Sequence, residues 1–252
     1  MWNVLCQSVR GTSHERDGAA CQDYSTAVEV PLPAGPVLVL ACADGAGSAA
    51  HSQLGAQLAC DALVSRLAVD LVATGGLTQV SRERAIGWAR ASHEAVLAGA
   101  AIRGVEPRQF ACTLLFGVLG PAGAAFGQLG DGAIVVRRDG RHQHVFWPQS
   151  GEYVNTTNFI CDSRFESLLE FVWFDEPVDE VALLTDGLQS LALDFAKRAA
   201  HAPFFAPMFD VLRGHEAPET LLVPLGEFLA SPAVCQRTDD DKTLILATRA
   251  AK

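Results

Sequence analysis

Basic side chains are scarce in this sequence of 252 residues and are nowhere clustered. Lysine and arginine together number 19, against 29 aspartates and glutamates, which gives a formal net charge of −10 at neutral pH. Nucleic acids and anionic membrane surfaces are bound through basic faces, because their own charge is negative. We therefore expect a protein that binds neither nucleic acid nor a membrane.

Long apolar runs are missing as well. No segment reaches the roughly 20 consecutive apolar residues of a membrane-spanning helix, and residues 1–7 lack the basic start and apolar stretch of a secretion signal. These absences favour a cytoplasmic protein. With 49% apolar and 19% charged residues and no linker-like segment, the chain is expected to form a single domain over residues 1–252.

Paired cysteines are also lacking. The seven cysteines are odd in number and widely scattered, and none belongs to a Cys-x-x-Cys pair. This spacing favours neither a disulfide framework nor a zinc site. We expect most of them to be small core residues in a reducing compartment.

What the sequence does contain is a recurring pattern, an apolar strand-like run that ends in an aspartate next to glycine. The pattern places Asp44 after residues 37–43, Asp131 after residues 124–129 and Asp186 after residues 181–185. Taken singly, each is equally typical of a strand that ends in an ordinary Asp-Gly turn. Their recurrence favours a shared site at the strand ends.

Two further acidic positions flank strand-like segments. Asp23 precedes residues 25–30, and Asp239, Asp240 and Asp241 precede residues 242–248. If these strands share a sheet, the carboxylates meet at one edge and cannot all stay ionised unless cations compensate them. Carboxylates together with glycine carbonyls are hard oxygen ligands, which suit Mg²⁺, Mn²⁺ or Ca²⁺ better than zinc.

Six motifs follow one another in a characteristic order. They are Gln-Asp at 22–23, Ala-Asp-Gly-Ala-Gly at 43–47, Cys-Thr-Leu-Leu-Phe-Gly at 112–117, Gly-Gln-Leu-Gly-Asp-Gly at 127–132, Leu-Thr-Asp-Gly-Leu at 184–188 and Asp-Asp-Asp-Lys-Thr-Leu at 239–244. This ordered set resembles the metal-dependent serine/threonine protein phosphatases of type 2C. The opening Gly-Thr-Ser-His at 11–14 is similar to a bacterial branch of that family, and the resemblance spans residues 11–247.

The fold that the resemblance implies is α+β, a four-layer αββα sandwich of two antiparallel sheets flanked by helices. The chain has no regular alternation of strand and helix, which disfavours a doubly wound sheet. Apolar spacing predicts helices over residues 51–73, 78–100, 188–199, 203–213 and 218–230. Residues 11–20 are expected to be a loop, and residues 112–138 a three-stranded meander with short hairpins.

The resemblance also implies a site and a mechanism. Asp44 would bridge two Mg²⁺ or Mn²⁺ ions, with the Gly45 carbonyl on one ion and Asp186 and Asp241 on the other. Such a pair of ions activates a water for in-line attack on phosphorus. The implied substrate is a phosphoserine or phosphothreonine protein, and the implied partners are that protein and a paired serine/threonine kinase. We expect a monomer.

The remaining acidic positions have less definite roles. The resemblance implies that Asp131 holds a third ion, but Gly-Asp-Gly is equally typical of a plain hairpin turn, and Asp239 and Asp240 are expected to be solvated loop charges. The resemblance implies that Asp23 orients metal-bound waters from behind the ligands. His51 and His93 have no ligand spacing and are expected to play ordinary helix roles.

The sequence departs from the family pattern at two positions. Gly18 stands where many members carry a phosphate-binding arginine, so His14 or Arg16 is a candidate to replace it, the alternative being a solvated loop charge. Gln22 stands where many carry glutamate, which removes a charge next to the second ion. Both departures leave open a catalytically weak or silent phosphopeptide-binding module on the same fold. A hydrolase of small phosphate esters is a further alternative.

One long segment has no clear period. Residues 148–165 lie near the cleft in the resemblance and vary between members, so they are expected to carry substrate selectivity.

Overall fold

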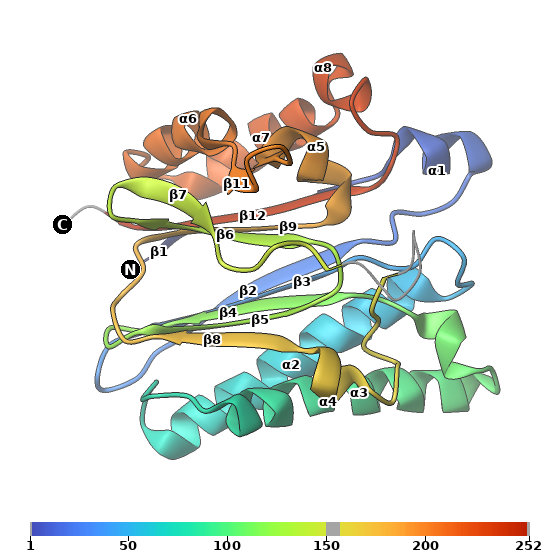
Figure 1. Cartoon of the computed structure of the whole chain (residues 1–252), viewed down its shortest axis with the longest axis horizontal. Helices are drawn as coiled ribbons and strands as arrows, with labels where there is room; N and C mark the ends of the chain where they lie inside the picture. The colour runs from blue at the N-terminus through green and yellow to red at the C-terminus, as the bar shows by residue number, and fades with distance from the viewer. Residues whose placement is uncertain (1, 150–156, 251–252) are drawn as a thin grey trace.

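The computed structural model describes residues 2–149 and 157–250. Within them the chain forms two antiparallel sheets packed face to face, with helices on both outer faces (Figure 1). One sheet has the order β1-β12-β9-β6-β7 and the other the order β2-β3-β4-β5-β8. The expected α+β sandwich of two helix-flanked antiparallel sheets is thus confirmed.

The strands of the two sheets, and a separate short pair, have the following bounds. They are β1 (Trp2–Val9), β2 (Tyr24–Val30), β3 (Val37–Ala43), β4 (Leu114–Leu119), β5 (Ala124–Leu129), β6 (Ala133–Arg138), β7 (Arg141–His144), β8 (Glu170–Phe174), β9 (Glu180–Leu184), β10 (Leu193–Asp194), β11 (Ala199–Ala200) and β12 (Lys242–Arg249).

The helices comprise long ones on the outer faces and short turns at the sheet ends. They are α1 (Thr12–Asp17), α2 (Ser52–Thr74), α3 (Arg82–Arg103), α4 (Phe165–Leu168), α5 (Gln189–Ala192), α6 (Ala202–Arg213), α7 (Leu222–Leu229) and α8 (Pro232–Cys235), with the 3₁₀ turns η1 (Pro107–Phe110), η2 (Asp186–Leu188) and η3 (Pro218–Leu221).

The unbroken apolar run of β3 follows from its place in the sandwich. Val37, Val39 and Ala41 pack in the core under the helices, whereas Leu38 and Leu40 pack in the core between the two sheets. Successive side chains of a strand point to opposite faces, and both faces of this strand are covered. A strand of this kind needs apolar residues throughout rather than an alternating pattern.

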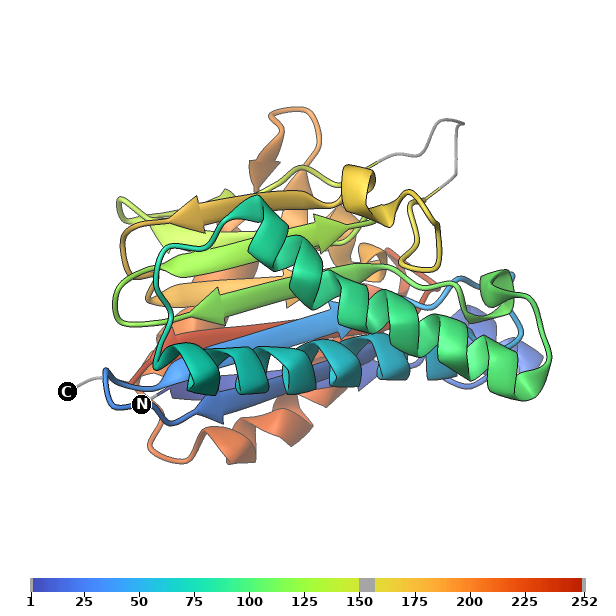
Figure 2. The same cartoon turned by 90° about the horizontal axis from the view of Figure 1, so that it is seen from below.

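Helices α2 and α3 cover one sheet, and α6 and α7 cover the other. Figure 2 shows α2 and α3 crossing the outer face of the sheet that contains β2 to β5. The side chain of Ser81 accepts a hydrogen bond from Arg84 N at the start of α3, and Gly104, with φ 64°, ends that helix. This cap and the αL glycine place α3 a few residues later than the apolar spacing predicted.

The predicted three-stranded meander is wrong at its third strand. β4 pairs with β5, but β6 pairs with β9 and β7 in the opposite sheet. Gly130, with φ 110°, and Gly132 therefore carry the chain from one sheet to the other. A Cβ on Gly130 would lie 2.5 Å from Thr113 Cγ2, so both backbone angle and space require glycine there.

Two other local predictions are wrong. Residues 11–20 contain the helix α1, and residues 188–199 form α5 followed by the β10–β11 hairpin rather than one helix. The hairpin turn is stabilised by Asp194 Oδ1, which accepts a hydrogen bond from Lys197 N. Arg198, at φ 48°, takes the left-handed backbone conformation that closes the turn. Of the segment expected to carry selectivity, Asn155 and Thr156 lie outside the described residues.

Candidate metal centre

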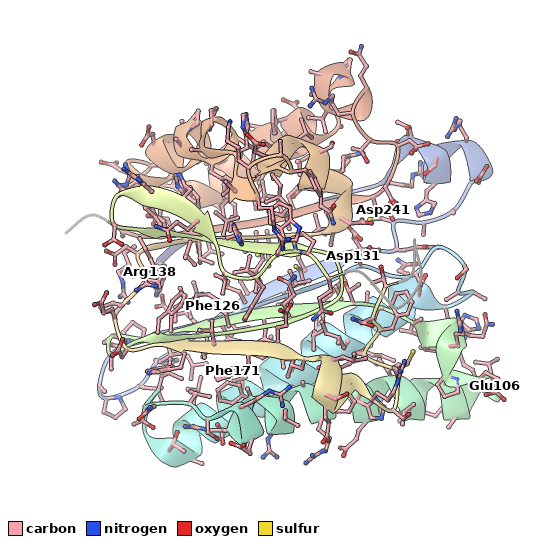
Figure 3. All side chains as sticks on the ribbon, viewed as in Figure 1. Glu106, Phe126, Asp131, Arg138, Phe171 and Asp241 are labelled. Carbon is pink, nitrogen blue, oxygen red and sulfur yellow. The ribbon has the colours of Figure 1, made fainter. Side chains whose placement is uncertain are left out.

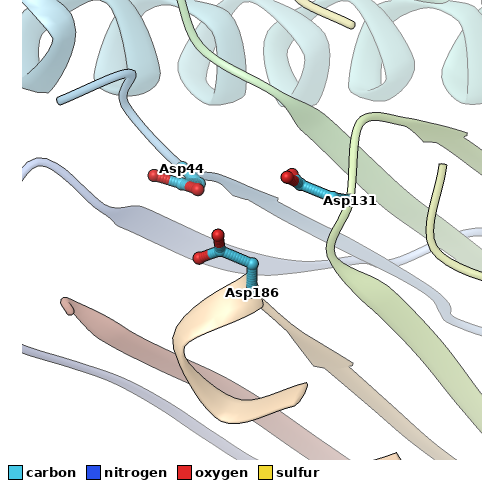
Figure 4. Close-up of side chains that lie close together, drawn as sticks. All are labelled: Asp44, Asp131 and Asp186. Carbon is cyan, nitrogen blue, oxygen red and sulfur yellow. The ribbon is translucent and has the colours of Figure 1, made fainter. Parts of the chain in front are cut away.

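Three aspartates meet at one end of the sandwich. Asp44 follows β3, Asp131 lies in the crossing from β5 to β6, and Asp186 follows β9, so both sheets contribute. Figure 3 places Asp131 at this end and Arg138 at the other. One carboxylate oxygen from each aspartate lies within 4.8 Å of the other two (Figure 4). The prediction that these strand-end carboxylates converge is confirmed.

The cluster has a strained electrostatic balance. Burial, and then the charges of Asp23 and Asp186, hold the pKa of Asp44 well above its ordinary value. Burial, and then the charge of Asp131, raise the pKa of Asp186 to about 7. The pKa of Asp131 is also raised, chiefly by burial. Bound cations would remove this repulsion and lower these pKa values.

The donor set fits hard divalent ions. Besides the three carboxylates, the cleft is lined by Gly45 and Gln22. Within the described residues Asp131 Oδ1 and Gln22 Oε1 are buried without a hydrogen-bond partner, and such orphaned oxygens are typical of an ion or water site. A Cβ on Gly45 would lie 2.6 Å from Gln22 O. All these donors are oxygens, the ligands of Mg²⁺ and Mn²⁺ rather than of softer metals.

The backbone around the cluster is tied down by hydrogen bonds. Asp44 N donates to Thr113 Oγ1 at 2.9 Å, and Thr113 N donates to Asp44 O at 2.8 Å. The hydroxyl of Thr157 donates to Asp131 Oδ2, and the side-chain amide of Gln189 donates to the Asp131 carbonyl. Both aspartates are thus held in place before any ligand binds.

Asp241 does not join the cluster, contrary to the prediction. Its two carboxylate oxygens accept hydrogen bonds of 2.6 Å from Gly11 N and Gln22 N, and His14 Nδ1 lies 2.9 Å from Oδ2. Asp240 lines the cleft instead, and its charge helps to raise the pKa values of Asp44, Asp131 and Asp186. Asp240, which was expected to be a solvated loop charge, is exposed and lies at the cleft beside the three aspartates.

Asp23 lies behind the cluster. Its Oδ2 accepts a hydrogen bond of 2.7 Å from Thr185 Oγ1, and the side chain is buried. Burial is the main reason why the pKa of Asp23 is raised to about 8. Asp23 in turn raises the pKa of Asp44, so it acts on the ligands without lining the cleft.

The two candidates for a phosphate-binding cation differ in position. His14 lines the cleft, next to the Asp241 carboxylate. Arg16 Nη2 instead lies 3.1 Å from Asp239 Oδ2, and both side chains are about two-thirds exposed, so the assignment of Arg16 is wrong. Gly18 ends α1 with φ 68°, a backbone conformation that disfavours the arginine found there in many family members.

The cleft has a volume of about 810 Å³, and two arginines outside the motifs, Arg108 and Arg164, line it alongside the aspartates. Arg164 belongs to residues 148–165, which were expected near the cleft, whereas no sequence signal pointed to Arg108. His51 and His93 do not line it among the described residues. His51 contacts the Phe110 ring, and His93 stacks on Phe165.

A helix-flanked double sheet that gathers aspartates at one end, around a space for hard cations, belongs to the metal-dependent protein phosphatases. The chain is a member of the protein phosphatase 2C family, whose model matches residues 10–226. Serine/threonine-protein phosphatase 3 of Escherichia coli K12 is 36% identical over 249 residues, which cover 98% of each chain.

Solved structures share the fold. The catalytic domain of the serine threonine protein phosphatase PstP, in complex with two manganese ions, superposes with a TM-score of 0.65 at 16% identity, covering 99% of each chain. The phosphatase Stp1 of Staphylococcus aureus gives 0.64 at 14% identity, covering 100% of this chain and 96% of its own. Across residues 2–149 and 157–250, every helix is too short or too polar to span a bilayer.

Proposed function

We propose that this chain hydrolyses phosphoserine and phosphothreonine in proteins and that it uses two Mg²⁺ or Mn²⁺ ions. The observation that carries the proposal is the cluster of Asp44, Asp131 and Asp186, whose carboxylates lie within 4.8 Å of one another and have no compensating cation among the described residues. The name of the E. coli relative and the two manganese ions of PstP point the same way.

The described residues suggest a ligand set. Asp44 would contact both ions, with the Gly45 carbonyl on one of them. Asp186 and Asp240 would hold the other ion, Asp240 taking the place first assigned to Asp241. Asp131 would serve a third ion. When bound, such ions supply a water activated near neutral pH for attack on the phosphorus.

The protein's own groups have separate tasks in this proposal. Thr113 fixes the backbone of Asp44, so the ligand distances are set in advance. Gln22 presents its unpartnered amide oxygen to the cleft and can accept a hydrogen bond from water. Asp23 keeps its place through Thr185 and orients water from behind the ligands.

The catalytically silent module is the weaker alternative. A module that binds phosphopeptides without metal would gain stability by replacing mutually repelling carboxylates with amides, yet this chain keeps Asp44, Asp131, Asp186 and Asp240. Uncompensated buried charge is costly, so a cation-dependent activity explains the cluster better.

The test is hydrolysis of p-nitrophenyl phosphate and of a phosphothreonine peptide with Mn²⁺, with Mg²⁺ and with chelator. We expect turnover of both substrates that requires the divalent ion and is lost in Asp44→Asn. The exposed Asp175 gives a matched control, Asp175→Asn, which should keep the wild-type rate. No turnover with either ion would favour the silent module, and turnover of the small ester alone would favour a small-ester hydrolase.

The proposal extends to partners, oligomeric state and place of action. We propose that the substrate is a protein phosphorylated by a serine/threonine kinase and that the enzyme acts as a monomeric single domain in the cytoplasm. A phosphoproteome compared with and without the active enzyme would identify the substrate, and sedimentation would report the oligomeric state.

A further inference from the structure

The loop at η1 is attached to the loop that carries Asp44. Ala46 N donates to Ala111 O at 2.9 Å and His51 N to Gln109 O at 2.8 Å, and Ala50 N donates to Gln109 Oε1 at 3.1 Å. A β-bridge between Gly45 and Cys112 continues this contact. Residues 107–113, here called the η1 loop, therefore keep a fixed position relative to the metal centre.

Phe110 anchors the η1 loop in the core. Its side chain is fully buried and touches the ring of His51, with a centroid distance of 5.2 Å. Gly55 of α2 permits the close approach, because a Cβ there would lie 2.1 Å from Phe110 O. The η1 loop is thus a rigid support rather than a free surface loop.

Arg108 projects from this support into the cleft without a counter-ion. It is exposed, it lines the cleft, and no carboxylate of the described residues lies within ion-pair distance of it. Two other cationic side chains line the cleft, but His14 lies 2.9 Å from Asp241 and Arg164 lies 3.3 Å from Asp162. Arg108 differs from both in that, among the described residues, its guanidinium has no hydrogen-bond or ion-pair partner.

The η1 loop runs from Thr113, which is hydrogen-bonded to Asp44, out to the exposed Arg108. Figure 3 places Glu106, two residues before Arg108, at the outer end of the helix layer, away from Asp131 and Asp241. The cleft volume of about 810 Å³ also exceeds that of a phosphoryl group, so residues next to the phosphorylated one have room inside it. Arg108 is therefore placed to meet a neighbour of the phosphorylated residue.

We propose that Arg108 determines substrate specificity by binding an acidic side chain that flanks the phosphorylated residue. The planar guanidinium forms paired hydrogen bonds with a carboxylate, and here its donors are uncommitted. A protein with a net charge of −10 otherwise repels acidic substrates. The positive charge of Arg108 at the cleft would offset this repulsion for peptides that carry an acidic residue beside the phosphorylated one. This inference rests on the proposed phosphatase function.

The test compares phosphothreonine peptides that carry alanine, aspartate or lysine at each of the three positions on either side of the phosphothreonine. For the wild type we expect kcat/KM to be about three- to fivefold higher with aspartate than with alanine at one or more positions, the range of an exposed ion pair. Arg108→Ala should abolish this preference, and Arg108→Glu should reverse it toward lysine. The preference should weaken at high salt because exposed charges are screened.

The controls separate this idea from the phosphatase proposal. Arg103, an exposed arginine at the end of helix α3 and five residues before Arg108, gives the matched control, and Arg103→Ala should keep the wild-type preference. Hydrolysis of p-nitrophenyl phosphate reports the phosphatase activity itself, and its absence in the wild type would defeat the proposed function rather than the role of Arg108. A wild type without acidic preference would overturn the inference. So would an Arg108→Ala enzyme that keeps this preference, or that loses small-ester and peptide activity to the same extent.

Discussion

Strand β9 has one carboxylate at its start and another two residues past its end, and the protein compensates their charges in opposite ways. Glu180, at its start, is 2% exposed and lies within 4.0 Å of Arg213, Arg137 and His142. Burial alone would raise the pKa of Glu180, but contacts with His142 and Arg213 lower it below its ordinary value. Asp186, just past the other end, has carboxylates for neighbours and a pKa raised to about 7.

The difference shows which acidic groups serve structure and which serve a ligand. The protein supplies its own cations at Glu180, so that charge is compensated as soon as the chain folds. At Asp186 the compensation has to come from outside, because no arginine, lysine or histidine of the described residues lies within ion-pair distance of the cluster. The uncompensated carboxylates lower the free energy of unfolding of the metal-free protein, and the same carboxylates form a binding site for cations.

The sharpest way to break this comparison is Asp186→Asn. We expect phosphatase activity to fall by about 100-fold or more, because a metal ligand is lost. The metal-free protein should become more stable by about 1 kcal/mol, because a repelling charge is removed. Activity assays with Mn²⁺ and urea unfolding with chelator measure the two effects. A less stable metal-free variant would contradict the electrostatic argument.

Glu180→Gln should have the opposite effects, a loss of stability with no loss of activity. It leaves Arg213 and His142 around an uncharged amide, so we expect a loss of about 2 kcal/mol in the free energy of unfolding. The rate of hydrolysis should stay at the wild-type level, because Glu180 is remote from the cleft. Urea unfolding beside a rate measurement tests both statements, and a lost rate in a folded variant would refute them.

Asp240 and Asp241, which directly precede β12, allow the same comparison between a ligand carboxylate and a structural carboxylate at neighbouring positions. We expect Asp240→Asn to weaken Mn²⁺ binding by about tenfold, because affinity follows the charge of the ligand set. Asp241→Asn should instead destabilise the fold, because its carboxylate accepts hydrogen bonds from Gly11 N and Gln22 N. Calorimetric Mn²⁺ titration and thermal unfolding separate the two. Equal Mn²⁺ affinities in the two variants would favour the original assignment of Asp241.

The smallest expected effect is on the pH dependence of stability. The pKa of Asp186 is about 7 in the folded state and about 3.9 when unfolded. Below pH 4 both states are protonated, so Asp186 costs nothing. Between pH 4 and 7 the unfolded state loses the proton first, so folding becomes less favourable as pH rises, and above pH 7 the cost is constant.

This pH effect is measured as a difference between two metal-free proteins. Relative to Asp186→Asn, the wild type should lose unfolding free energy between pH 4.5 and 7.5, with an upper limit of about 3 kcal/mol set by the two pKa values. Solvent screening at the partly exposed carboxylate lowers this loss toward about 1 kcal/mol. Saturating Mn²⁺ should recover that loss at pH 7.5. A difference between the two proteins that does not vary with pH would show that Asp186 ionises freely.

The sequence sufficed for the parts of the molecule that are determined by local pattern. The run before Asp44 is apolar on both faces, which predicts a covered strand, and the repeated strand-end aspartates predict a converging cluster. The pairing of β6 could not be predicted, because Gly-Asp-Gly at 130–132 is compatible with a hairpin as well as with a crossing between sheets. Only the contacts of β6 with β9 decide between them.

The errors in the site have a similar origin. Three consecutive aspartates precede β12, and successive residues point in different directions, so a shift of one position exchanges Asp240 for Asp241. The role of Arg108 depends on backbone hydrogen bonds between the η1 loop and residues 44–52, which are far apart in sequence. No local pattern reports such a contact.

The metal cluster takes its carboxylates from both sheets, and this has a mechanical consequence. Because Asp44 belongs to one sheet and Asp186 follows a strand of the other, an ion that binds both joins the two halves of the sandwich. An ion present at 100 times its dissociation constant adds about 2.7 kcal/mol to the folded state. Metal binding and the packing of the two sheets against each other are therefore thermodynamically linked. Removal of the metal with a chelator should weaken the contact between the sheets.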